Sequence, residues 1–156
     1  MILHFYHKKT LLAKLLYWFG DGTKNHVAIE IDGNVWEAIG GRFGVSGVFK
    51  SSHYLTYHKG KRAPISVESY KIPATIKGLI KAERFLESQE GRKYDYKAIV
   101  GFLFRGVRQS GQAWFCSEIA ARAVEIATGI EFNINRVSPS ILLDVVKFPK
   151  GEKIKA

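Results

Sequence analysis

The chain has 156 residues, 46% of them hydrophobic, and 24 lysines and arginines against 14 acidic residues give it a formal charge of +10. This length predicts a single domain, residues 1–156, with one core. A single cysteine excludes an intramolecular disulfide, and the lack of eighteen consecutive apolar residues predicts no membrane span. Because no secretion signal is recognisable near Met1, we expect a cytoplasmic protein.

The positive charge predicts attraction to anionic partners such as nucleic acid, lipid head groups or acidic polymers. The lysines and arginines are spread along the chain in ones, twos and threes, without a block or a nucleic-acid signature. We therefore expect diffuse attraction and no specific nucleic-acid partner. The rival to an enzyme is a non-enzymatic basic adaptor whose binding falls steeply with salt.

The first predicted elements are a short strand at 1–6 and an amphipathic helix at 10–19. Two alternating segments, 25–31 and 34–39, then flank Asp32-Gly33. Asp-Gly between alternating segments is the strongest short-range signal for a β-hairpin with a two-residue turn.

This hairpin predicts a meeting of two polar side chains. With Asp32 and Gly33 as the turn, Ala28 faces Glu37, so His26 and Glu37 become diagonal neighbours on one face. A carboxylate beside an imidazole fixes its orientation and stabilises its protonated form, as a general base for a thiol requires. Glu30 lies on the same face and could take the place of Glu37.

The middle of the chain predicts a glycine-rich loop at 40–48 that flanks a cleft, and a strand within 61–70. A helix follows, ended by Gly91. Its predicted apolar face comprises Ile76, Leu79, Ile80 and Leu86.

Two further helices and a tail complete the predicted elements. Asp95 is a candidate N-cap for a central helix that extends to Leu103, and Ser138 is the N-cap of a short helix at 140–146. We expect the lysine-rich end from Lys150 to be loose.

The only cysteine, Cys116, lies at the predicted start of a helix. Gly129 ends this helix, and an apolar stripe runs along it at Ile119, Ala120, Ala123, Val124 and Ala127. A helix start favours thiolate over thiol: with a cationic imidazole nearby, it can lower a thiol pKa from ~8.5 to about 3.5–7.5. The alternative is that Cys116 is a small buried hydrophobe.

In their order and spacing, His26, Glu37, Tyr94-Asp95-Tyr96 and Phe115-Cys116-Ser117-Glu118 resemble a known pattern. The chain from Leu11 to Ile141 resembles the circularly permuted papain-like amidases, relatives of the NlpC-type cell-wall peptidases, in which histidine precedes cysteine. The resemblance implies an α+β fold of the permuted papain-like (NlpC-like) type, with a small antiparallel sheet packed against helices.

The resemblance also implies roles for individual residues. Cys116 is the nucleophile, His26 the base, and Glu37 the residue that orients His26. The protein would be a cysteine hydrolase, an amidase or peptidase that forms a thioester and needs neither metal nor cofactor. Tyr94, Tyr96 and Trp114 are candidates for substrate binding, and aromatic core packing is their alternative role.

The expected substrate carries an amide or an ester. Cell-wall peptides suit the related peptidases, whereas lipid-linked acyl groups would make the protein a thiol-dependent acyltransferase or lipid acyl hydrolase through the same thioester. The sequence leaves the substrate, the acceptor and the oligomeric state open.

Overall fold

The structure is a computed structural model that describes residues 1–7, 24–40, 47–51, 66–96, 113–131, 137–147 and 152–154. Within these ranges the strands are β1 (Ile2–His7), β2 (His26–Ile31), β3 (Asn34–Ile39), β4 (Gly47–Ser51), β5 (Ser66–Lys71), β6 (Lys93–Tyr94), β7 (Ala113–Trp114) and β8 (Glu152–Ile154). The helices are α2 (Ile76–Gln89), α4 (Cys116–Thr128) and α5 (Pro139–Lys147).

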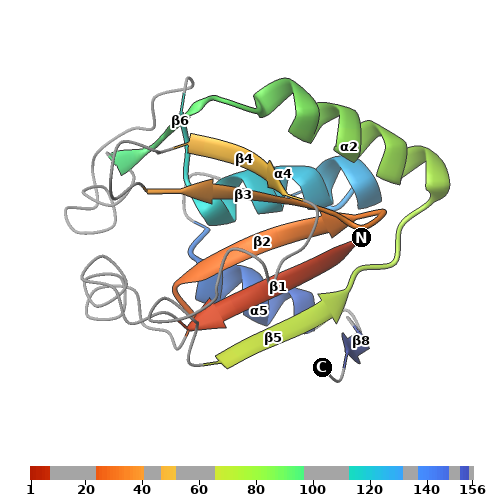
Figure 1. The fold of residues 1–156 in the computed structure, drawn as a ribbon. Coiled ribbons are helices and arrows are strands. Elements are labelled where there is room, and N and C mark those ends of the chain that lie inside the picture. The colour runs from red at the N-terminus through yellow and green to blue at the C-terminus, as the bar shows by residue number, and fades with distance from the viewer. Residues whose placement is uncertain are drawn as a thin grey trace.

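The fold is α+β, with an antiparallel sheet packed against helices, as the sequence predicts. Six strands form the sheet in the order β4-β3-β2-β1-β5-β8, and β6 and β7 form a separate parallel pair. Helix α4 crosses β2 and β3 and contacts both α2 and α5 (Figure 1). The sheet therefore has one face, the helix face, against α4.

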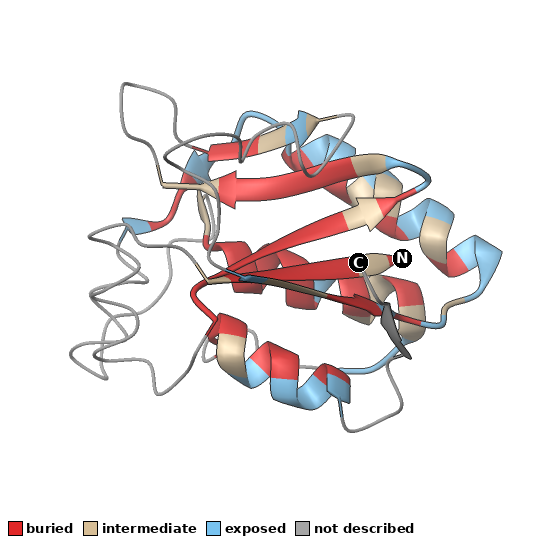
Figure 2. Cartoon of the chain, turned by 60° about the horizontal axis from the view of Figure 1, so that its bottom comes forward, coloured by how far each residue is buried: buried red, intermediate tan, exposed pale blue. Residues whose placement is uncertain are grey.

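Strict alternation along the strands divides their residues between the helix face and the opposite face. On β1, Leu3 and Phe5 enter the core with the α4 side chains, whereas Tyr6 packs with Ala28 and Val35 in a second cluster. Both faces of the central strands are buried (Figure 2). Polar side chains on the opposite face are therefore shielded from water as well, and they need hydrogen-bond partners.

The predicted hairpin is confirmed. Ile31 pairs with Asn34, which leaves Asp32 and Gly33 as the two turn residues. Their φ angles are 50° and 75°. Positive φ at both central positions matches the type I′ turn, which fits the twist of the two strands and explains the Asp-Gly pair.

Helix α4 begins at Cys116 and ends where Gly129 adopts a left-handed conformation with φ of 79°, both as predicted. Every residue of the predicted apolar stripe is buried. Helix α5 begins with the predicted cap, because the Ser138 hydroxyl accepts a hydrogen bond from the Ile141 N–H at 3.1 Å.

The predicted buried face of α2 is wrong at two positions. Ile76 is 79% exposed and Ile80 is 46% exposed. The buried residues are Gly78, Ala82, Leu86 and Gln89. The cause is the close crossing with α4: a Cβ at Gly78 would overlap the Ala127 carbonyl oxygen, so small residues must face α4.

Two further expectations need correction. Residues 152–154 of the tail form β8, which pairs with β5 at the sheet edge and is not loose. Gly47 and Val48 belong to β4 and not to the predicted loop, and the Val48 N–H donates to the Arg92 carbonyl at 2.9 Å. The predicted helix at 10–19, residues 41–46 and the helix beyond Tyr96 lie outside the described residues.

None of the described helices combines the length and apolar composition needed to cross a bilayer.

Candidate active site

Cys116 is the first residue of α4, and its neighbours fix the helix start. The Phe115 N–H donates to the Glu118 carboxylate at 3.0 Å, which satisfies one backbone donor at this end. The Ser117 hydroxyl donates to the Val137 carbonyl and ties α4 to the segment before α5. Cys116 itself is 1% exposed and packs within the main core. The thiol is therefore held in a rigid, dry setting.

His26 and Glu37 meet on the sheet, as the hairpin register predicts. His26 Nε2 lies 2.6 Å from Glu37 Oε2, and both side chains are buried. Such a short contact is typical of a charge-assisted hydrogen bond. It fixes the plane of the imidazole and assigns Nε2 to Glu37, so any proton exchange with a thiol has to use Nδ1.

The structure also decides between the two carboxylates that the sequence offers to His26. Glu30 Oε2 lies 2.9 Å from Nε2 of another histidine, His4. Glu30 is therefore engaged on β1, and Glu37 is the partner of His26.

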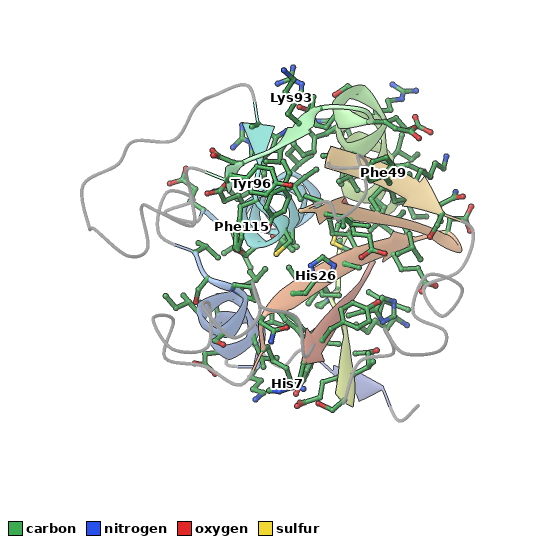
Figure 3. All side chains as sticks on the ribbon, turned by 60° about the vertical axis from the view of Figure 1, so that its left-hand side comes forward. His7, His26, Phe49, Lys93, Tyr96 and Phe115 are labelled. Atoms are coloured by element: carbon green, nitrogen blue, oxygen red, sulfur yellow. The ribbon has the colours of Figure 1, made fainter. Side chains whose placement is uncertain are left out.

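The elements that carry His26 and Cys116 start at the same end of the molecule. His26 is the first residue of β2 and Cys116 the first of α4. Both elements begin at the left of Figure 1 and run in the same direction, and α4 packs against β2. Figure 3, which looks onto this end, shows His26, Phe115 and Tyr96 in one part of the view.

Tyr94 packs beside Phe115 and Tyr96 at this end of the molecule. Its ring lies 5.7 Å from the Phe115 ring and 5.1 Å from the Tyr96 ring, and it packs against the backbone of Gly40 just after β3. Burial raises the pKa of Tyr94 well above its ordinary value, and negative charge on Cys116 raises it further. Tyr94 therefore keeps its hydroxyl proton and can donate a hydrogen bond in the vicinity of the thiol.

The other two substrate-binding candidates differ in placement. Tyr96 is exposed at the edge of Tyr94, where it can contact a ligand. Trp114 instead faces α2: its ring packs edge-on against Phe85 at 5.7 Å, and its indole N–H donates to Gln89 at 2.9 Å. The contacts of Trp114 support the packing role that the sequence left as its alternative.

A second polar cluster on the same sheet was missed in the sequence. His4 Nε2 contacts Glu30, and His4 Nδ1 lies 2.7 Å from the Ser69 hydroxyl. Burial lowers the pKa of His4, so the ring is neutral near pH 7. Ser69 lies 65 positions from His4, and no local pattern in the sequence links the two.

Within the described ranges, no group of three or more His, Cys, Asp or Glu side chains is placed to hold a metal ion. No protein-family model matches this chain, and no curated protein matches it either. Its function has to be inferred from the geometry of the site.

Proposed function

We propose that the protein is a thiol-dependent hydrolase of amides or esters, with Cys116 as nucleophile, His26 as base and Glu37 as the residue that orients His26. The observation that carries this proposal is the 2.6 Å contact between His26 and Glu37, at the end of the sheet where α4 begins with the only cysteine. The permuted papain-like (NlpC-like) fold is part of the same proposal.

The first step is a proton transfer. Nδ1 of His26 takes the proton of the Cys116 thiol, and Glu37 stabilises the resulting imidazolium through Nε2. The thiolate sulfur then bonds to the carbonyl carbon of the substrate, and the carbonyl π electrons move to oxygen. The oxyanion accepts hydrogen bonds from a backbone N–H at the start of α4 and from the Tyr94 hydroxyl.

The second half releases the products. The tetrahedral intermediate collapses to a thioester as the bond to the leaving amine or alcohol breaks, and the His26 imidazolium protonates that leaving group. Neutral His26 then takes a proton from water, and the hydroxide attacks the thioester. The C–S bond then breaks, the Cys116 sulfur takes the proton back from the His26 imidazolium, and the acid leaves, so the net reaction is hydrolysis.

One observation favours a second interpretation. Cys116 is 1% exposed and His26 is 7% exposed, and a buried thiol within a core is the usual state of a structural cysteine. The two interpretations differ in chemistry. A catalytic thiolate must react with small electrophiles in the folded protein, whereas a structural thiol reacts only when the protein opens.

The test is the rate of Cys116 alkylation by iodoacetamide from pH 5 to 9, followed by intact mass. The unfolded chain in denaturant serves as the reference thiol. We expect the folded protein to react faster than the reference below pH 7, because its thiolate persists there. A rate that rises only near pH ~8.5, or that equals the rate of global unfolding, would establish the structural interpretation.

A second measurement links the thiol to catalysis. After brief incubation with p-nitrophenyl acetate, the wild type should carry one acetyl group on Cys116 and then lose it to water. Cys116→Ala should carry none and should reduce hydrolysis by ~10³-fold or more. If the Cys116→Ala variant keeps the wild-type rate, hydrolysis does not use this thiol.

A further inference from the structure

The outward face of α2 combines apolar and cationic side chains. Ile76 and Ile80 lie one turn apart and are 79% and 46% exposed. Lys77, Lys81 and Arg84 are also exposed, and their spacing places them on the same side of the helix. We call these five residues the α2 face. Two large apolar side chains directed to solvent cost free energy, so this face is suited to a partner that takes up both kinds of side chain.

Within the described ranges, the cations of the α2 face have no acidic partner. Two acidic residues of α2 have partners on the sheet: Glu87 accepts a hydrogen bond from Lys50 at 3.4 Å, and Glu83 accepts one from Asn34 at 3.5 Å. Among the described residues, none forms a salt bridge with Lys77, Lys81 or Arg84. Relative to the part of the chain that the structure describes, this side of α2 therefore presents three unpaired cations.

A groove borders this face where the start of α2 meets the end of α4. It has a volume of about 660 Å³, and its lining includes Lys77, Lys81 and Ile126. Beyond it, Ile130 is also exposed. The groove thus brings ammonium groups and aliphatic carbon together beside the exposed isoleucines.

We propose that the α2 face binds the surface of an anionic lipid bilayer. Ile76 and Ile80 enter the boundary between head groups and acyl chains, and Lys77 and Lys81 pair with lipid phosphates. The net charge of +10 attracts the whole molecule to such a surface. The proposal is independent of Cys116 chemistry.

A second copy of the chain fits this face less well. A stable dimer buries ~800 Å² per partner, more than two isoleucines and a short groove provide. A twofold axis would also bring the same lysines of the two copies towards each other, which is unfavourable.

Helix α5 supplies a matched control. Ile141 is 50% exposed and Val145 is 36% exposed, at the same spacing as the α2 pair. Between them in the sequence is exposed Asp144, so this apolar pair is flanked by an acid, whereas the α2 pair is flanked by lysines. A bilayer with negative head groups should distinguish the two helices.

The experiment is co-sedimentation with vesicles of phosphatidylglycerol and phosphatidylcholine in equal parts, compared with pure phosphatidylcholine. We expect binding only to the anionic vesicles. Lys77→Gln/Lys81→Gln should weaken it by about fivefold per lysine. Ile76→Ser/Ile80→Ser should weaken it about tenfold. Ile141→Ser/Val145→Ser and Cys116→Ala should leave it unchanged.

All variants are at exposed positions except Cys116→Ala, and circular dichroism checks that each is folded. If the isoleucine variant binds as tightly as the wild type, the attraction comes only from the overall charge and the proposal is wrong. It is equally wrong if the α5 variant loses as much binding. A third outcome is that the wild type is a dimer in light scattering, and that Ile76→Ser/Ile80→Ser loses the dimer without a change in vesicle binding. This outcome would assign the face to a second copy of the chain.

Discussion

The two histidine–glutamate pairs on this sheet make the same hydrogen-bond contact but lie in different surroundings. In both pairs Nε2 contacts the carboxylate, at 2.6 Å for His26–Glu37 and 2.9 Å for His4–Glu30. His26 is the first residue of its strand, at the end where α4 begins. His4 lies within β1, between β2 and β5, and its Nδ1 faces Ser69.

Because the two pairs have different surroundings, a hydrogen-bonded histidine–glutamate pair is not a catalytic site by itself. Around His4, the backbone N–H groups of three adjacent strands are used in the sheet, so none is available to stabilise an oxyanion. His26 is instead the first residue of β2, at the end of the sheet where α4 also begins (Figure 1). This contrast is why the proposed chemistry is placed at the His26 pair, whereas the His4 pair is expected to hold strands together.

The largest difference between the two pairs is expected when the imidazole ring of each histidine is removed. His26→Ala should slow alkylation of Cys116 at pH 6.5 by ~100-fold, because the thiolate loses its imidazolium partner. His4→Ala should change this rate less than twofold. The measurement is the rate of Cys116 alkylation by iodoacetamide in both variants. If the two variants slow alkylation equally, the distinction between the pairs is wrong.

A smaller difference is expected from the carboxylates. Glu37→Gln keeps the shape but removes the charge that stabilises the His26 imidazolium, so alkylation near neutral pH should fall about tenfold. Glu30→Gln is the matched control and should have no effect on the thiol. If the alkylation rate of Glu37→Gln has the same pH dependence as that of the wild type, the charge of Glu37 does not act on the thiol and its role is packing alone.

The next effect concerns stability alone. Ser69→Ala removes the hydrogen bond to His4 Nδ1 and should lower the free energy of unfolding by about 1 kcal/mol. Urea denaturation measures this loss, and alkylation of Cys116 should remain at the wild-type rate. A slower alkylation rate in this variant would connect the two pairs and contradict their separate roles.

The smallest effect is a pH dependence. Burial lowers the pKa of His4 below its ordinary 6.5, so between the two values the unfolded chain binds more protons than the folded protein. The stabilising contribution of neutral His4 is thus complete above pH 6.5 and is lost as pH falls through the folded pKa. Urea denaturation should show a steeper decline towards pH 5 in the wild type than in His4→Gln. Parallel curves would show that His4 does not titrate on unfolding.

The sequence predicted the features that depend on local geometry. These features are the Asp32-Gly33 turn, the start of α4 at Cys116 and its end at Gly129. Each of them depends on residues that are close to it in the sequence. The meeting of His26 and Glu37 followed from the turn, because register propagates along a hairpin.

Features that depend on distant partners were not predictable. Ile76 and Ile80 look like core residues, yet α4 approaches so closely at Gly78 that a Cβ there would overlap the Ala127 carbonyl oxygen, and both isoleucines remain exposed. Likewise, β8 forms because β5 offers it an edge more than 80 positions upstream, and Ser69 completes the His4 cluster from another strand. Local periodicity contains no information about such contacts.

The contact at Gly78 has a mechanical consequence. Since backbone touches backbone there, α2 and the last turn of α4 have no side chain between them to absorb a displacement. Helix α4 has 13 residues, a stiff rod of about 20 Å. We therefore expect a displacement of α2 to move α4 with it, including the far end that carries Cys116.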